Sequence, residues 1–173
     1  MDASRARYRF GAISRVEPEA IGVPGQRTFR LILESGPGSA SLWLEKEQLS
    51  QLAIYIQEII SSLPSSTGKA GSEAPEPPWD GGVNNVDFKI GRLVLGHDTS
   101  SNCFLVVVHD IEETDENSPT LSCWLTLSQG EELAKEALKV CAAGRPICYL
   151  CKQPINPDGH MCVRANGHAS FQG

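Results

Sequence analysis

Cys103-Phe-Leu-Val-Val-Val-His109 is a run of consecutive apolar residues that ends on a histidine. A strand with one solvated face alternates apolar and polar residues, whereas a strand covered on both faces is apolar at successive positions. Residues 103–109 are therefore expected to form a strand in the interior of a sheet.

The segments on either side of this run predict two more strands and a helix. Residues 88–95 and 121–127 have strand patterns, and Ser128-Gln-Gly-Glu131 has the form of a helix capping box. Apolar residues then recur at helical spacing until Gly144 ends the pattern: Leu133, Ala134, Ala137, Leu138 and Cys141. Residues 86–144 thus predict the order strand-strand-strand-helix.

Residues 1–63 predict the same order of elements. Strand patterns occur at residues 7–13, 26–33 and 39–44. In the second of these, Phe29, Leu31 and Leu33 are expected to face the core. Pro64 ends a helical stripe of apolar residues, which consists of Leu49, Leu52, Ala53, Ile56, Ile59, Ile60 and Leu63.

A shared motif links the two halves: Ser41-Leu-Trp43-Leu44 and Ser122-Cys-Trp124-Leu125 each end a third strand. The sequence predicts an α+β fold in which a duplicated strand-strand-strand-helix unit forms one mostly antiparallel sheet with both helices on one face. Residues 64–85, rich in Ser, Gly, Pro and Glu, are expected to be a flexible linker. The matched tryptophans are expected to be packing anchors.

The tail, residues 145–173, contains the clearest chemical motif. Cys148-Tyr-Leu-Cys151 is followed by His160 and Cys162 after a return rich in Pro, Asn and Gly. Three thiols and an imidazole form a tetrahedral zinc ligand set. We expect one structural Zn²⁺ per chain, because four protein ligands leave no coordination position for a substrate.

Alternatives to this ligand set remain open. His168 or Cys141 could replace His160 as the fourth ligand, and the cysteines could instead be reduced thiols on a flexible tail. A thioredoxin-type cysteine pair would stand at the start of a helix that follows a strand. Cys148 instead follows the end of the predicted helix. Cys103 and Cys123 lie, like Cys141, in apolar patterns and are expected to be small core residues.

Three stretches carry a resemblance to a known family. They are Gly22-Val-Pro-Gly-Gln-Arg-Thr-Phe29, Leu44-Glu-Lys-Glu-Gln-Leu49 and the tail motif between Ala143 and Gly167. With them the chain resembles a bacterial family of unknown function, DUF family 3090, found chiefly in actinobacteria. In that family proline often follows the first and last tail cysteines, where Tyr149 and Val163 stand here. The resemblance implies the architecture and brings no established activity.

Charge and hydropathy restrict the partners. The chain has a net charge of −6, but from Lys139 onward four basic residues stand against Asp158 alone, which leaves −9 for residues 1–138. An acidic body repels nucleic acid, so only the tail, with Lys152 and Arg164, could contact RNA. No signal peptide or membrane-spanning run is present, so we expect a soluble, cytoplasmic protein.

No catalytic constellation is recognisable. His97-Asp98 and His109-Asp110 pair an imidazole with a carboxylate, but neighbours on a strand point to opposite faces. Gln26 and Arg27, after a tight turn, could hold an anionic ligand or could simply keep an edge strand soluble.

The leading hypothesis is a non-catalytic zinc-binding adaptor that contacts a protein partner. The alternative is an enzyme or small-molecule binder with a pocket between the two halves, with Gln26, Arg27, His109 and Arg164 as the possible ligand-binding residues.

Overall fold

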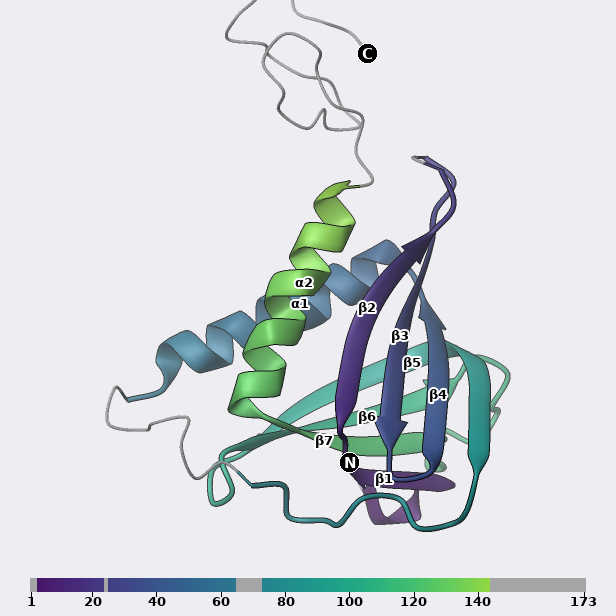
Figure 1. The fold of residues 1–173 in the computed structure, drawn as a ribbon, viewed down its shortest axis with the longest axis vertical. Coiled ribbons are helices and arrows are strands. Elements are labelled where there is room, and N and C mark those ends of the chain that lie inside the picture. Colours follow the sequence, from purple (N-terminus) through teal and green to yellow (C-terminus); the bar gives the residue numbers. More distant parts are fainter. Residues whose placement is uncertain (1–2, 24, 65–72, 144–173) are drawn as a thin grey trace, which may run out of the picture.

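The computed structural model describes residues 3–23, 25–64 and 73–143. Over these residues the protein has an α+β fold with seven strands and two α-helices (Figure 1). The elements are β1 (Tyr8–Ala12), β2 (Arg15–Ile21), β3 (Thr28–Ser35), β4 (Gly38–Leu44), α1 (Lys46–Ser62), β5 (Asn84–Asp98), β6 (Cys103–Asp110), β7 (Leu121–Thr126) and α2 (Leu127–Ala143).

The strands form one mixed, mostly antiparallel sheet in the order β1-β7-β6-β5-β4-β3-β2. Two pairs are parallel, β1 with β7 and β4 with β5, and the other four are antiparallel. The prediction of a mostly antiparallel sheet is confirmed, and so is the interior position of residues 103–109, because β6 lies between β7 and β5.

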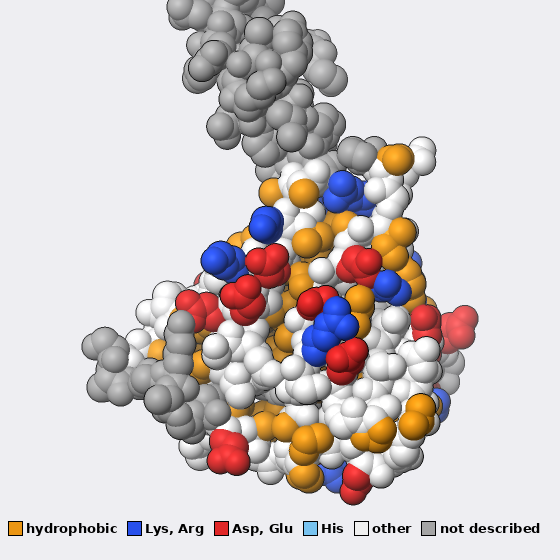
Figure 2. All heavy atoms as spheres, in the orientation of Figure 1, with side chains coloured by type: hydrophobic (Ala, Val, Ile, Leu, Met, Phe, Trp, Pro, Cys, Tyr) orange, Lys and Arg blue, Asp and Glu red, His pale blue; other side chains and the backbone are white. Residues whose placement is uncertain are grey.

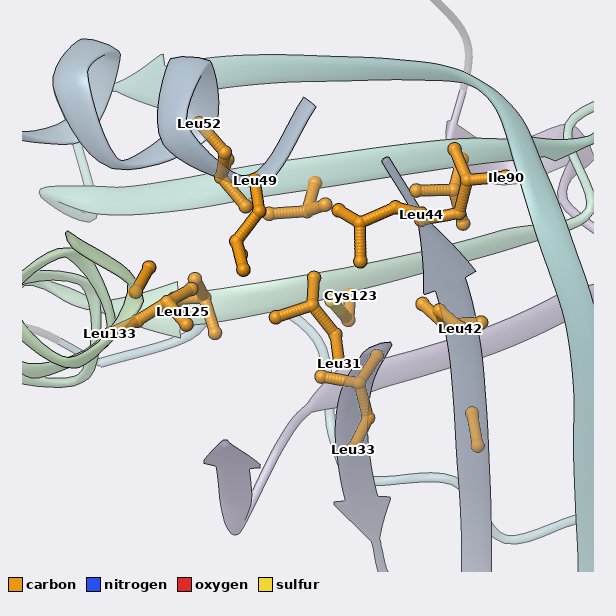
Figure 3. Packing of buried hydrophobic residues seen from close by; sticks show 14 of the residues in the cluster. Leu31, Leu33, Leu42, Leu44, Leu49, Leu52, Ile90, Cys123, Leu125 and Leu133 are labelled. Atoms are coloured by element: carbon orange, nitrogen blue, oxygen red, sulfur yellow. The ribbon is translucent and has the colours of Figure 1, made fainter. Parts of the chain in front are cut away.

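One hydrophobic core joins the sheet to both helices (Figure 3). Phe29, Leu31 and Leu33 of β3 are buried in it, as their alternation predicts. Side chains from α1, including Leu49 and Leu52, point toward these strand residues. The helices also contact each other, so both cover the same core.

Two long extended segments change partner part-way along their length. In β5, residues 84–89 pair with β4 in parallel, and residues 90–98 pair with β6 in antiparallel fashion, with a register shift at Gly91. Residues 8–21 behave similarly, because β1 pairs in parallel with β7 and β2 pairs in antiparallel fashion with β3. In Figure 1, β2, β3 and β4 accordingly lie along one axis, with alternating directions, and β6 and β7 run across that axis.

Glycine permits the close packing at the first of these changes. Gly11 has a φ of +60°, in the left-handed region that non-glycine residues seldom adopt. A Cβ atom there would lie 1.9 Å from the carbonyl oxygen of Pro77. The register of β1 shifts between Arg9 and Gly11, so this glycine marks a bulge at which the chain bends.

The sequence interpretation missed β2, so the first half contains four strands where three were expected. β2 is an edge strand, and Pro18 within it pairs with Leu31 of β3. Proline cannot donate to a strand ladder, but an edge strand has one side without a partner and tolerates it. Arg15, Glu17 and Glu19 do alternate with less polar residues, but the proline among them argued against a strand.

The capping box of α2 lies two residues earlier than predicted. The helix begins at Leu127, the Thr126 N–H donates to Gln129 Oε1 at 2.9 Å, and the Gln129 N–H donates to Thr126 Oγ1 at 3.1 Å. Gln129 Nε2 also donates to the carbonyl oxygen of Ile13 at 2.8 Å. The start of α2 is therefore tied to the chain between β1 and β2.

Residues 73–83, part of the expected linker, pack against the sheet. The ring of Trp79 lies 5.7 Å from that of Phe10 and 6.1 Å from that of Tyr8, measured between centroids. Its backbone N–H donates to Ser35 Oγ at 2.9 Å. The Ser35 hydroxyl is fully buried and is shared between the carbonyl oxygens of Phe10 and Ala12. One hydroxyl thus connects three segments that are distant in sequence.

Replacing Ser35 with alanine should lower the free energy of unfolding by about 1–3 kcal/mol, because the Trp79 N–H and two carbonyl oxygens would lose a partner in a buried site. Urea denaturation measures the loss. Ser39→Ala is the matched control, since the Ser39 hydroxyl bonds to Asn85 at an exposed position and its removal should cost less than about 0.5 kcal/mol. Equal losses in the two variants would contradict the assigned role of Ser35.

Candidate functional site

The predicted zinc ligands Cys148, Cys151, His160 and Cys162 lie outside the described residues, as do Arg164 and His168. The zinc site therefore stays a prediction. Within the three described ranges, no group of three or more His, Cys, Asp or Glu side chains is arranged to hold a metal ion.

We call the residues that the structure describes the body of the protein. Its three cysteines are buried, as predicted. Cys103 and Cys123 are at most 1 % exposed, and Cys141 is 4 % exposed. Burial raises the pKa of Cys123 from its usual 9.0 to about 12, so it is a neutral thiol at physiological pH. The Cys141 sulfur lies 3.9 Å from the carbonyl oxygen of Lys46. As a zinc ligand Cys141 would have to leave this packed position.

Gln26, Arg27 and His109 do not form one cluster. Gln26 and Arg27 lie between β2 and β3, whereas His109 lies in β6, and β4 and β5 separate β3 from β6 in the sheet. Arg27 Nε and His109 Nδ1 are each buried without a hydrogen-bond partner among the described residues. The two side chains are therefore separate features.

The neighbours His97 and Asp98 bond to different groups, as expected for adjacent residues on a strand. His97 Nε2 is 2.9 Å from Asn102 Oδ1, and its ring packs against Phe104. The Asp98 carboxylate accepts hydrogen bonds from Ser101 and Ser100, which lower its pKa. Asp98 is therefore an anion at neutral pH that closes the turn between β5 and β6.

The two matched tryptophans lie on the face of the sheet opposite the core, in different surroundings. Trp43 Nε1 donates to Asp87 Oδ1 at 3.0 Å, and the guanidinium of Arg30 stacks 5.2 Å from its ring centroid. Trp124 is instead flanked by Leu105 on β6 and Ala12 on β1. Both rings are partly buried by these neighbours.

A groove of about 550 Å³ lies between α1 and β5. Its walls are mainly apolar, with Leu52, Tyr55 and Ile59 on the helix facing Leu93 and Leu95 on the strand. Polar residues of the first helical turns also line it, namely Glu47, Gln48 and Gln51. Tyr55 remains 53 % exposed. The groove lies between a helix of the first half of the chain and a strand of the second half. Its volume is large enough to receive apolar side chains.

Sequence analysis did not identify this groove. The signal available in the sequence was weak: Leu93-Val94-Leu95 is apolar at three successive positions, and Tyr55 and Ile59 repeat at helical spacing. Only the packing of α1 beside β5 shows that these residues face each other.

Charges on the surface of the body are mixed. In Figure 2, acidic and basic side chains lie side by side over the visible face. Several form ion pairs, such as Arg30 with Glu19 at 2.6 Å and Arg15 with Glu34 at 3.2 Å. No helix in the described ranges has the length and apolar character needed to cross a bilayer.

The fold defines the class of protein. It is an α+β protein in which two long extended segments change pairing partner, and the single mixed sheet is covered by two helices. The model of one protein family, described as "Protein of unknown function (DUF3090)", matches residues 8–162. The chain therefore belongs to that family, as its three sequence stretches indicated. No curated protein and no solved structure matches the chain.

The raised pKa of Cys123 predicts a loss of stability at alkaline pH. A thiol whose pKa is higher in the folded state contributes stability that is complete below about pH 9 and is lost as the pH rises toward 12. Between pH 7 and about pH 10.5, the free energy of unfolding should fall by about 2 kcal/mol more in the wild type than in Cys123→Ala. Denaturant titrations at each pH measure this difference, and parallel pH profiles would contradict the prediction.

Proposed function

We propose that the protein is a zinc-containing interaction module, an adaptor whose tail contacts a protein partner. The observation that carries the proposal is the donor set of the tail: Cys148, Cys151, His160 and Cys162 fall within fifteen residues. Such a short segment has little apolar content from which to build a core, and structural zinc supplies about 10–16 kcal/mol of apparent binding free energy in comparable peptides.

The body supports this assignment of ligands. Cys103, Cys123 and Cys141 are all buried in it, so the three tail cysteines are the thiols left to share a metal. Four protein ligands complete a tetrahedral shell, which makes the ion structural. In the reducing cytoplasm, where we place the protein, closely spaced cysteines serve as metal ligands more often than as disulfides.

The body itself is, on this proposal, a duplicated scaffold. Residues 8–21 and 84–98 change partner in the same way, and each half continues through two antiparallel strands and a helix. The motif Ser-x-Trp-Leu ends the third of these strands in both halves. A glutamine four residues beyond the leucine, Gln48 or Gln129, then accepts a backbone hydrogen bond at each helix start. Such agreement in sequence and pairing favours a common ancestral unit.

The basic residues of the tail indicate how it would contact a partner. Lys152 and Arg164 lie among the ligands or next to them, while the body is acidic. A zinc-ordered loop would present these charges in a fixed geometry to an acidic protein surface.

A second candidate, a small-molecule binder, is favoured by the groove between α1 and β5. It lies between the halves, where such a pocket was expected, although it is lined by neither Arg27 nor His109. Apolar walls with a few polar groups are typical of ligand pockets.

Purified protein should contain about one zinc ion per chain, measured by elemental analysis, because one closed ligand set is present. Cys151→Ser should lose the zinc and leave the urea midpoint of the body unchanged. Cys141→Ala is the matched control and should retain the metal. Zinc-free wild-type protein, or zinc lost on Cys141→Ala with the fold intact, would contradict the proposed ligands.

Capture of a defined protein partner should depend on the zinc-loaded tail. Affinity purification should recover the same partner with the wild type and Cys141→Ala but lose it with Cys151→Ser and on deletion of residues 145–173. A partner retained by both tail variants would refute the adaptor role of the tail. A small molecule that binds in the groove, seen as chemical-shift changes at Leu93 and Leu95, would favour the second candidate.

A further inference from the structure

Half of β5 has an edge without a strand beside it. β4 pairs only with residues 84–89 of β5, and residues 90–98 pair with β6 on the other side. Among the described residues, no strand pairs with the outer edge of that second half. An exposed strand edge presents a row of backbone donors and acceptors that another chain can use.

The sheet ends at β1 and β2, and the outer edge of β2 is protected in ways that this one is not. β2 contains Pro18, and its charges are paired within the molecule, as in Arg15 with Glu34 and Glu19 with Arg30. α2 contacts β2 more extensively than α1 contacts β5. Proline, charge and helical cover are the devices by which proteins prevent edge pairing.

Residues 92–98 have none of these devices in their central part. Leu93, Val94 and Leu95 are apolar and only partly buried, and the groove beside α1 runs along them. Tyr55 of α1 also lines this groove and is 53 % exposed. The open edge and this exposed aromatic residue thus lie next to each other, as they would at an interface.

The sequence of this edge is complementary to itself when run antiparallel. Pairing two copies with Leu95 opposite Leu95 sets Arg92 of one chain opposite Asp98 of the second copy, and the same pair repeats across the twofold axis. Val94 then faces Gly96, which has no side chain to obstruct it. Arg92 and Asp98 are six residues apart in a strand, so both lie on the same face and can pair directly.

The two charged groups are available for this pairing. Arg92 is exposed, and it has no ion pair within the described residues. Asp98 is held in place by Ser100 and Ser101 at the end of the strand and is anionic at neutral pH. A fixed carboxylate at one end of the edge and a free guanidinium at the other favour a single register.

We propose that the protein forms a twofold symmetric dimer through antiparallel pairing of residues 92–98 of β5, with the occupant of the α1–β5 groove being the second copy of the chain. The contact is isologous, so the same patch serves both subunits and association stops at two. The sheets of the two subunits become continuous, and Tyr55 and Leu95 of both chains meet beside the axis. This dimer goes beyond the adaptor proposal and requires neither zinc nor the tail.

Light scattering coupled to gel filtration on the full chain should give the mass of two 18.7 kDa chains. Arg92→Glu places two pairs of like charges across the axis and should raise the dimer dissociation constant by about tenfold, because each cross-strand pair changes from attraction to repulsion. Leu95→Arg, which sets two cations at the axis, should give a monomer. Lys135→Glu on α2 is the control of equal charge change and should leave the dimer intact.

Mixing two variants tests the register itself. Arg92→Glu and Asp98→Lys should each dimerise weakly alone, whereas an equimolar mixture should restore dimerisation, since the mixed dimer contains one native and one reversed ion pair. Circular dichroism and urea midpoints verify that each variant is folded. If Asp98→Lys is unfolded because its turn is lost, the masses of Leu95→Arg and Arg92→Glu decide whether residues 92–98 form the dimer interface.

Three results would overturn the dimer. They are a wild-type monomer at the highest soluble concentration, a dimer unaffected by Leu95→Arg, or folded variants whose mixture fails to associate. A wild-type monomer whose groove binds a strand of another protein would likewise overturn the dimer. Cys151→Ser separates this inference from the adaptor proposal: the dimer should persist in it even though the zinc is lost.

Discussion

The change of partner within each long strand is the constraint on which the rest of the structure depends. β5 pairs with β4 through residues 84–89 and with β6 through residues 90–98, with a register shift at Gly91 between the two stretches. Residues 8–21 pass from β7 to β3 just after the bulge at Gly11. Because each long segment pairs with strands of both halves, the two halves form one sheet and enclose one core that the two helices complete.

The features that the sequence predicted are those determined by local patterns. Alternation in residues 28–33 identified the buried face of β3, the apolar run at residues 103–109 identified an interior strand, and the helical stripe before Pro64 identified α1. Each of these signals is contained in fewer than about twenty residues. Periodicity detects such elements because one face of each must be apolar if it is to join a core.

The features that the sequence did not predict depend on residues far apart in the chain. β2 has the composition of a loop, and it is a strand because β3 supplies a partner along its whole length. Trp79 stands in a segment rich in Pro and Ser, yet it packs against Phe10 and bonds to Ser35. The groove likewise depends on where α1 lies relative to β5. The zinc ligands could be proposed because they are local, but their arrangement in space could not.

A difference between the two helices affects how closely each packs on the sheet. Counting from the shared Trp-Leu pair, Gly130 of α2 corresponds to Leu49 of α1. A Cβ atom on Gly130 would lie 2.5 Å from the ring of Phe104, so glycine allows α2 to pack directly on the sheet. Leu49 is fully buried, and its larger side chain occupies the equivalent space between α1 and the strands. A helix that rests on a leucine cannot approach its sheet as closely as one that rests on a glycine. The α1 side therefore keeps an opening beside an unpaired strand edge, whereas α2 contacts β2, a strand that carries proline and paired charges.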